Sequence, residues 1–144
     1  MEIRKITTAD IDAVAKLEEE NFDMPWKKSD FEDLIDKEDR GCVVALEGDR
    51  LVGCVVYHNI VGDVDITNVQ VKDVCRRKGI ARELMKEAMK EARAAGGDNF
   101  TLEVRASNAP AIALYESLGF VSEGVRPNFY EHPTEDAIIM WKRN

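Results

Sequence analysis

The sequence predicts a mixed α/β fold with a mostly antiparallel sheet, and three observations support this class. Runs rich in β-branched residues alternate along the chain with segments whose apolar residues recur at helical spacing. Two of these runs are separated only by Gly48-Asp49, a pair suited to the tight hairpin turn that joins antiparallel strands. The chain has 144 residues, 44% of them hydrophobic, which suffices for a full core without disulfides. We therefore expect a single domain over residues 1–144.

The chain begins with a strand and a helix. Residues 2–6 alternate polar and apolar side chains, as a half-buried strand does. Thr7 or Thr8 can cap the helix that follows, and we expect this helix to continue to about Asn21. Its apolar stripe consists of Ile11, Val14, Ala15 and Leu17.

A second, shorter helix is expected after an aromatic loop. The loop FDMPWKK, residues 22–28, interrupts the helical periodicity at Pro25. Ser29 and Glu32 have the spacing of a capping box, which predicts a helix that ends near Lys37.

Three strands are expected in the middle of the chain. Residues 42–47 and 50–60 are rich in β-branched side chains and form the hairpin. Residues 63–71 continue the sheet as a third antiparallel strand. The alternation of this strand slips near Thr67 and Asn68, which predicts a bulge.

Helices and strands alternate in the second half. The longest helix is expected over residues 78–95, where apolar side chains recur at helical spacing until Gly96-Gly97 ends the run. A strand, a helix and two closing strands follow, over residues 100–104, 108–118, 121–125 and 136–141.

Charge and cysteine usage exclude several classes of function. The chain has 28 acidic and 20 basic residues, and its net charge of −8 opposes nucleic-acid binding and favours basic partners. Its three cysteines are widely spaced and form no metal-binding pattern with the two histidines, so neither a disulfide framework nor a zinc site is indicated. No apolar run approaches the ~20 residues of a membrane helix. We expect no metal, no nucleic-acid or membrane partner, a cytoplasmic location and, by default, a monomer.

A basic, glycine-containing loop, RRKGIA at residues 76–81, is expected between a strand and the longest helix. Backbone N–H groups converge at a helix N-terminus and bind phosphate readily, and Gly79 permits close approach of a bulky anion. Four cations lie in or beside the loop: Arg76, Arg77, Lys78 and Arg82. The loop is neither a Walker motif nor GxGxxG. A helix start with solvated basic neighbours is the commoner meaning of such a loop taken alone.

Residues 102–120, LEVRASNAPAIALYESLGF, place a carboxylate, an amide and a phenol on one strand-loop-helix unit. Glu103 lies near the end of the strand, Asn108 begins the helix and Tyr115 is about two turns into it. Each residue also has a structural explanation, as a solvated strand residue, a helix cap and a surface phenol respectively. Together the three groups could provide the acid and the base of one acyl transfer.

In this order the segments resemble the GNAT superfamily of N-acetyltransferases. The cofactor loop of that family has Arg or Gln, two residues, Gly, one residue, and Gly or Ala, which are Arg76, Gly79 and Ala81 here. More narrowly, EVRASN, AIALYESLGF and DAIIM are similar to the RimI-type subfamily, which acetylates the N-terminal alanine of the eighteenth small-subunit ribosomal protein. The resemblance implies a mixed, mostly antiparallel seven-stranded sheet flanked by four helices and splayed between its fourth and fifth strands.

The resemblance also implies roles for individual residues. It implies that Glu103 is the general base and Tyr115 the general acid. It also implies that acetyl-CoA is the cosubstrate and that no metal takes part. The implied acetyl-CoA contacts are Val69, Gln70, Val71, Arg76, Arg77, Lys78, Gly79, Ile80, Ala81, Arg82 and Asn108. The implied acceptor is a basic N-terminal peptide of a ribosomal protein, bound by Pro25, Trp26, Phe129 and Tyr130, although the family often has tyrosine in place of Phe129. An acidic rim could attract this peptide, and its expected members are Glu18, Glu19, Glu20, Glu131 and Glu135.

Two other functions stay open at this level. The acceptor could be a broader set of protein N-termini, a lysine side chain or a small amine. Alternatively, the chain could be an acyl-CoA-binding regulator without catalysis, although such a regulator has no need of both Glu103 and Tyr115.

Overall fold

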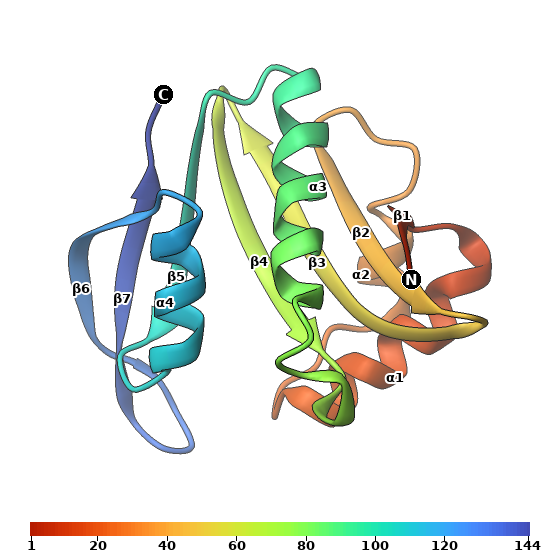
Figure 1. The fold of residues 1–144 in the computed structure, drawn as a ribbon, viewed down its shortest axis with the longest axis horizontal. Coiled ribbons are helices and arrows are strands. Elements are labelled where there is room, and N and C mark those ends of the chain that lie inside the picture. Colours follow the sequence, from red (N-terminus) through yellow and green to blue (C-terminus); the bar gives the residue numbers. More distant parts are fainter.

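Seven strands form one sheet in the order β1-β2-β3-β4-β5-β7-β6 (Figure 1). The computed structural model describes residues 1–144. The strands are β1 (Glu2–Lys5), β2 (Arg40–Glu47), β3 (Arg50–Ile60), β4 (Asp63–Val71), β5 (Asn99–Arg105), β6 (Val121–Tyr130) and β7 (Glu135–Lys142). The α-helices are α1 (Ile11–Asn21), α2 (Lys28–Glu32), α3 (Ile80–Ala94) and α4 (Ala109–Ser117), and two 3₁₀ turns, η1 (Thr8–Asp10) and η2 (Asp73–Cys75), precede α1 and α3. The predicted class is confirmed, because every strand pair is antiparallel except β4 with β5.

The parallel pair β4 and β5 separates along its length. Only three residue pairs are in register, from Asp63 with Asn99 to Asp65 with Thr101. Beyond them β4 has no partner strand on this side, and Figure 1 shows the two strands diverging downward. The predicted bulge is present: the register of β3 with β4 shifts between Cys54 and Val56, and Asn68 has a φ of 50°. A bulge increases local twist, which helps to turn β4 away from β5.

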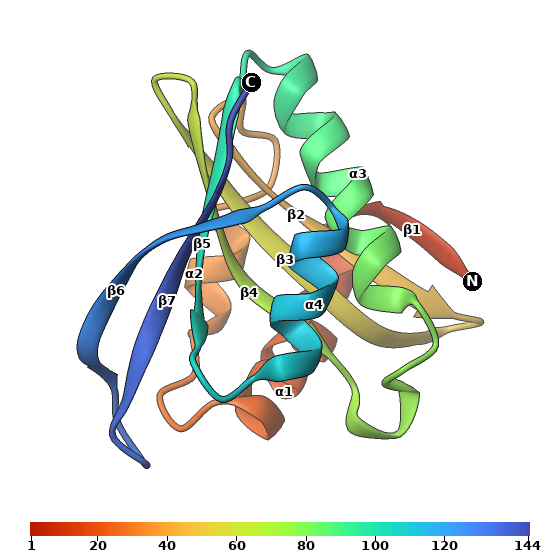
Figure 2. The same ribbon diagram turned by 60° about the vertical axis from the view of Figure 1, so that its left-hand side comes forward.

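The helices cover the two faces of the sheet and divide the core into two clusters. In Figures 1 and 2, α3 and α4 lie on one face and α1 and α2 on the other. The first cluster joins the buried face of α3, including Leu84 and Met85, to the sheet and to Tyr115 of α4. The second joins α1 to Phe31 of α2 and to the opposite face of β2 and β3. The predicted apolar stripe of α1 is buried throughout. No helix has both the length and the apolar stretch that crossing a membrane requires.

Two predicted elements differ from the structure. The capping box at Ser29 and Glu32 is wrong, because the N-cap is Lys27, two residues before Ser29, and the carboxylate of Asp30 accepts a hydrogen bond from the backbone N–H of Lys27 at 2.8 Å. The helix also ends at Glu32 rather than near Lys37. The sixth strand extends to Tyr130 rather than ending near Val125. The sequence Pro127-Asn128 indicates a turn, but an edge strand tolerates proline, and the register shift between Arg126 and Tyr130 accommodates the left-handed Asn128 at φ 54°.

Candidate active site

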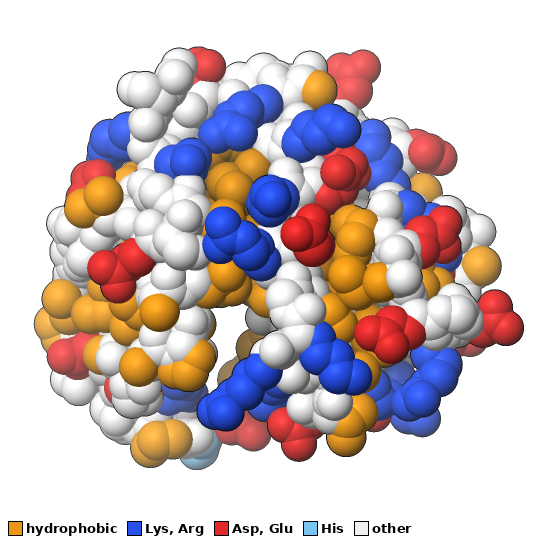
Figure 3. All heavy atoms as spheres, viewed as in Figure 1, with side chains coloured by type: hydrophobic (Ala, Val, Ile, Leu, Met, Phe, Trp, Pro, Cys, Tyr) orange, Lys and Arg blue, Asp and Glu red, His pale blue; other side chains and the backbone are white.

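A cleft of about 630 Å³ lies at the splay, which is the place where β4 and β5 separate. It is bounded by the end of β4, the loop before α3, and α4. Figure 3 shows this face of the molecule hollowed between its two halves, with hydrophobic and basic side chains around the opening. The volume lies within the range of about 300–1,000 Å³ that is typical of small-molecule and cofactor sites. Ten predicted site residues line the cleft: Val69, Gln70, Val71, Arg76, Arg77, Gly79, Ile80, Ala81, Asn108 and Tyr115.

The N-terminus of α3 presents unpaired backbone donors to this cleft. The N–H groups of residues 77–82 donate no hydrogen bond within the protein. Such donors, together with the positive end of the helix dipole, form a ready site for a phosphate group. Gly79, the N-cap, has a φ of 79°, and a Cβ built on it would meet no atom within 4 Å. Glycine is therefore needed here for its left-handed conformation rather than for space.

The four cations near the loop divide into two groups. The guanidinium of Arg76 donates to Asn21 Oδ1 at 3.1 Å, to the carbonyl of Val71 at 3.2 Å and to Asp73 Oδ1 at 3.2 Å. The guanidinium of Arg82 donates to Ser117 Oγ at 2.7 Å and so links α3 to α4. Both side chains therefore hold parts of the protein together.

Arg77 and Lys78 form the second group. Both side chains are exposed, and neither makes a hydrogen bond or an ion pair within the protein. They are thus the two cations of the loop whose charges remain available to an anion, although Lys78 and Arg82 do not themselves line the cleft.

The three predicted contacts on β4 reach the cleft at the unpaired edge of the sheet. Pairing with β5 ends at Asp65, so Val69 and Val71 lie on a strand without a neighbour on that side. The side chain of Gln70 is not free, because its Nε2 donates to Glu18 Oε1 at 2.7 Å. We therefore expect β4 to contribute backbone groups, and valine side chains, to a ligand in the cleft.

Sequence reasoning missed a buried polar network that shapes this end of β4. Glu18 on α1 is only 2% exposed, and its two carboxylate oxygens accept four hydrogen bonds. The donors are Nδ2 of Asn68, Nε2 of Gln70 and the backbone N–H of Trp26. One signal could have found it: Glu18 lies four residues after Val14 and seven after Ile11, so it belongs to the apolar stripe.

Tyr115 lies on the α3 side of the sheet, at the wall of the cleft. The side chain is 6% exposed, and burial raises its pKa to about 12, with a smaller contribution from Tyr130. Its phenol is therefore fully protonated at neutral pH. Asn108 caps α4 through a hydrogen bond that its Oδ1 accepts from the backbone N–H of Ala111 at 3.3 Å. Its role as a cap is thus present, and its side chain also lines the cleft.

Glu103 lies on the other face of the sheet. Its neighbours Leu102 and Val104 belong to the core cluster beneath α3, and alternation directs Glu103 away from that cluster. Its side chain is 29% exposed, but Oε2 is buried without a hydrogen-bond partner, and Arg126 Nε lies 3.6 Å from it. Glu103 is not among the residues that line the cleft. The acid and the base expected to share one cleft therefore approach the splay from opposite faces.

Tyr130 connects these two residues electrostatically. Burial raises the pKa of Tyr130, the nearby charge of Glu103 raises it further, and Arg105 lowers it. Tyr130 in turn raises the pKa of Tyr115. The guanidinium of Arg105 lies 4.5 Å from the centre of the Tyr130 ring and donates to the carbonyls of Glu131 and Pro133, which holds the β6–β7 turn.

The expected acceptor residues lie at the open end of the splay. Figures 1 and 2 place the α1–α2 loop, with Pro25 and Trp26, and the β6–β7 turn at the same end of the molecule. Trp26 is half-buried and packs on Phe31 with ring centres 5.3 Å apart. Phe129 is 47% exposed and contacts the ring of Tyr130 edge-on at 5.1 Å. None of the four expected acceptor residues is among those that line the cleft, and Phe129 is the most exposed of the aromatic side chains on the two segments.

The expected acidic rim needs correction. Glu18 is buried in the network described above, so it is not part of any rim. Glu135 is partly buried and accepts hydrogen bonds from the guanidinium of Arg105 and the backbone N–H of Ser107, and these contacts lower its pKa. Glu19, Glu20 and Glu131 remain as exposed carboxylates.

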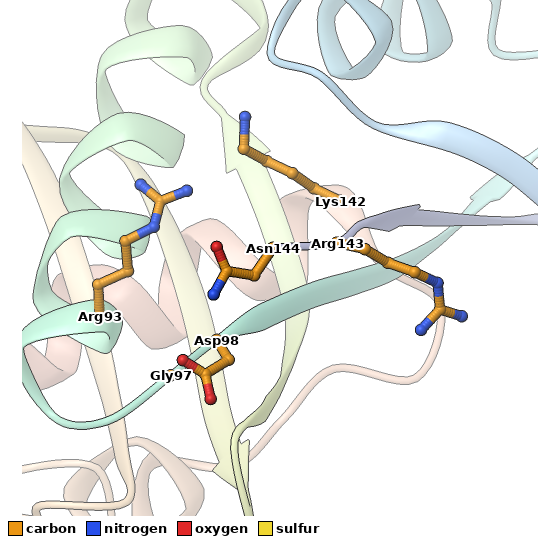
Figure 4. Close-up of a pocket in the computed structure, with 6 residues that line it drawn as sticks. All are labelled: Arg93, Gly97, Asp98, Lys142, Arg143 and Asn144. Carbon is orange, nitrogen blue, oxygen red and sulfur yellow. The ribbon is translucent and has the colours of Figure 1, made fainter.

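A second cavity, of about 460 Å³, lies at the other end of the sheet beside the C-terminus (Figure 4). Its lining is polar and includes Arg93, Lys142 and Arg143. Figure 4 shows these side chains pointing in different directions. Nζ of Lys142 donates to the carbonyl of Leu118 at 2.6 Å, and Arg143 pairs with Glu123 at 2.8 Å. The cations do not converge, so we place the candidate active site at the splay.

The chain is similar to known N-acetyltransferases over nearly its whole length. Residues 11–120 match the Acetyltransferase (GNAT) family. The ribosomal protein bS18-alanine N-acetyltransferase of Salmonella typhimurium is 34% identical over 140 residues, which cover 94% of this chain and 92% of that protein. The crystal structure of the ribosomal-protein-S18-alanine N-acetyltransferase from Escherichia coli has a TM-score of 0.87 and 30% identity, and the match covers 99% of this chain and 92% of that one.

The same fold occurs in Arabidopsis thaliana NAA60, whose crystal structure is a complex with acetyl-CoA. That structure has a TM-score of 0.83 at 20% identity over 96% of each chain, which is a likeness of fold alone. The expected family and the splayed sheet are confirmed. From the family match over residues 11–120 and the 34% identity to a bacterial relative, the chain belongs to the GNAT family of acetyl-CoA-dependent N-acetyltransferases.

Proposed function

We propose that this chain transfers an acetyl group to the N-terminal α-amine of a protein, and specifically to the N-terminal alanine of ribosomal protein bS18. One observation supports this chemistry: Glu103 and Tyr115 approach the splay from opposite faces of the sheet, beside a cleft that contains unpaired backbone N–H donors. The acceptor is supported by the names of the Salmonella and Escherichia coli relatives. Such an acceptor implies a cytoplasmic location, and one domain over residues 1–144 suffices for the reaction.

The residues of the cleft fit the cosubstrate. Acetyl-CoA supplies the acetyl group in activated form, as a thioester. The N–H groups of residues 77–82, with Arg77 and Lys78, are suited to its pyrophosphate, because they combine unpaired donors with unpaired positive charge. Val69 and Val71 provide the unpaired edge of β4 along the cleft. Asn108, Ile80 and Ala81 complete the wall on the side of α3 and α4.

Glu103 and Tyr115 would move the protons. An N-terminal amine has a pKa of ~8, so most of it is protonated at neutral pH and must lose a proton before it can attack. Glu103 Oε2 takes this proton, because it is a buried acceptor without a hydrogen-bond partner. Tyr115 Oη then gives a proton to the departing sulfur.

The raised pKa of Tyr115 sets the cost of that second transfer. From a phenol with a pKa of about 12 to a thiolate whose conjugate acid has a pKa of ~8.5, the transfer is uphill by roughly 5 kcal/mol. This is well below the barrier of about 16 kcal/mol that corresponds to a turnover of ~10 s⁻¹. A buried phenol is therefore an adequate acid here, and it cannot lose its proton before the reaction.

The acceptor side supports a peptide rather than a small amine. The α1–α2 loop and the β6–β7 region carry the aromatic side chains Trp26 and Phe129, and Glu19, Glu20 and Glu131 are exposed acids. An extended basic peptide can contact both kinds of group at once.

The decisive experiment offers acetyl-CoA with peptides that begin with Ala, Ser, Gly or Met, together with lysine-containing peptides with a blocked N-terminus and polyamines. Tandem mass spectrometry then locates the acetyl group. We expect modification of the α-amine, fastest on the peptide with the sequence of the bS18 N-terminus. Acetylation of lysine side chains alone would overturn the proposal, and CoA binding without turnover on any amine would favour the regulator.

The catalytic assignment has its own test. Glu103→Gln and Tyr115→Phe should each lower kcat, by ~10²-fold or more for a general acid or base, while leaving the KM for acetyl-CoA nearly unchanged. Phe129→Leu serves as a control on the acceptor side, because it should change the KM for the peptide rather than kcat. Near-normal kcat in both Glu103→Gln and Tyr115→Phe would refute these roles.

A further inference from the structure

Two buried side-chain oxygens lack a hydrogen-bond partner in the protein, and both lie on the strands that separate at the splay. They are Thr67 Oγ1 on β4 and Glu103 Oε2 on β5. Arg126 Nε approaches Glu103 Oε2 to 3.6 Å, which is too long for a hydrogen bond. Because an unpaired buried polar atom costs free energy, such atoms in native proteins are usually satisfied by water or a ligand.

Thr67 and Glu103 occupy equivalent positions on the two strands. The last paired residues are Asp65 and Thr101, and one step of two residues along each strand leads to Thr67 and Glu103. Residues two apart on a strand share a face, so both side chains lie on the face covered by α1 and α2. The register of β3 with β4 agrees, because Thr67 is paired with Val56, which belongs to the core cluster beneath α1.

The spacing of the strands explains why these two oxygens do not bond to each other. Paired strands lie about 4.8 Å apart, and β4 and β5 have begun to diverge at this position. A hydroxyl that can donate and accept, opposite a carboxylate oxygen that accepts, provides two of the 2–4 polar partners that a buried water usually has.

We propose that Thr67 is a positioning residue for acetyl transfer: its hydroxyl and Glu103 Oε2 hold one water molecule between them, and this water passes the proton of the acceptor amine to Glu103. The proposal rests on the assignment of Glu103 as the base. The amine gives one proton to the water oxygen as the water gives one proton to Oε2, so the water is unchanged and one proton moves in total. The relay also accounts for the position of Glu103 outside the lining of the cleft.

The alternative is that the Thr67 hydroxyl is simply packed. Thr67→Val distinguishes the two, because valine has nearly the shape of threonine and lacks the hydroxyl. If the hydroxyl is only packed, replacing an unpaired buried oxygen by a methyl group leaves stability equal or higher and kcat unchanged. If it holds the water, kcat falls.

The kinetic test compares Thr67→Val, Thr67→Ser and a matched control, Thr101→Val. Thr101 lies on the same face one step earlier, and its hydroxyl donates to the carbonyl of Met140 at 3.1 Å. We expect Thr67→Val to lower kcat about tenfold with the KM for acetyl-CoA unchanged, and Thr67→Ser to restore kcat to within about twofold. Thr101→Val should keep the wild-type kcat. Wild-type kcat in Thr67→Val, or a raised KM for the peptide alone, would overturn the proposal.

A second test does not depend on activity. Unfolding in urea is measured for wild type, Thr67→Val, Glu103→Gln and the double variant. If the two side chains share one water, their effects on the free energy of unfolding are coupled and do not add. Additive effects would refute the shared water even in an active enzyme. A chain that acetylates no amine would overturn the proposed function instead, and the coupling would still decide whether Thr67 and Glu103 hold a common water.

Discussion

Replacing Glu18 should destabilise the protein more than any other single change of an acidic residue on α1. The carboxylate is 2% exposed and accepts four hydrogen bonds from three donor groups on two other segments, β4 and the α1–α2 loop. In Glu18→Ala, the amides of Asn68 and Gln70 and the N–H of Trp26 lose their acceptor. Removing one member of a buried charged network typically costs 3–5 kcal/mol, against a total stability of about 5–15 kcal/mol.

Glu18→Gln should keep the hydrogen bonds from β4 and lose the one from the α1–α2 loop. If the carbonyl oxygen of the new amide takes the place of Oε1, it still accepts from Gln70 and Asn68, which donate at 2.7 and 3.0 Å. The NH₂ group then faces the N–H of Trp26, where the carboxylate accepted at 3.2 Å. Two donors would face each other, so we expect a loss of about 1–2 kcal/mol, located mainly at the α1–α2 loop.

The assay is urea unfolding followed by tryptophan fluorescence, with hydrogen exchange to locate the change. Trp26 is one of only two tryptophans in the chain, so the loop has its own optical signal. Glu19→Ala is the matched control, because its exposed carboxylate should contribute less than about 0.5 kcal/mol. If Glu18→Ala unfolds within 0.5 kcal/mol of wild type, roughly the size of that control, the reasoning about the buried carboxylate is wrong.

Three further predictions concern pH, the cofactor loop and salt. The pKa of Tyr115 is about 12 when folded and ~10 when unfolded, so its contribution to stability is fully present below pH ~10 and declines as the pH rises through 12. Urea unfolding across this window should therefore show wild type losing about 3 kcal/mol relative to Tyr115→Phe, and a constant difference between the two would contradict the burial argument. Arg77→Gln should raise the KM for acetyl-CoA about fivefold, which corresponds to the loss of ~1 kcal/mol from an exposed charge contact. Arg76→Gln should instead lower the melting temperature, because Arg76 links separate segments of the protein. If both variants changed only the KM, and by the same factor, Arg76 would not have this structural role. The kcat/KM for a basic acceptor peptide should fall between ~0.1 and ~1 M salt, because the Debye length shortens from about 10 to about 3 Å over this range. The kcat/KM for a neutral peptide should not change. Identical salt dependence for the two peptides would exclude electrostatic steering by the exposed acids.

Elements with strong periodic patterns were predictable from the sequence. The helix α3 repeats its apolar residues at helical spacing, and the hairpin of β2 and β3 has a glycine turn, so both lie close to their expected bounds. The bulge in β4 was visible as a slip in alternation near Asn68. Short elements were less predictable, because the capping of α2 depends on which of several neighbouring carboxylates reaches a backbone N–H.

The site was predictable as a set of residues and less so as an arrangement. The loop at residues 76–81 and Tyr115 line one cleft as expected, because each belongs to a motif whose spacing is local. The burial of Glu18 and the engagement of Arg76 were not expected, because both depend on contacts with segments about 50 residues away.

The sequence by itself determined the order of the elements, the family, and the chemical groups available for acetyl transfer, because these depend on local pattern and on motif. Only the tertiary structure decided that Glu103 and Tyr115 approach the splay from opposite faces, that Arg77 rather than Arg76 is free for an anion, and that Thr67 and Glu103 both lie one step beyond the last paired residues of β4 and β5. The engagement of Arg76 depends on its contacts with Asn21, Val71 and Asp73, whereas the other two facts depend on how far β4 and β5 remain paired. That distance is set by the twist of the whole sheet and by the contacts of β4 with α1, which no single segment specifies.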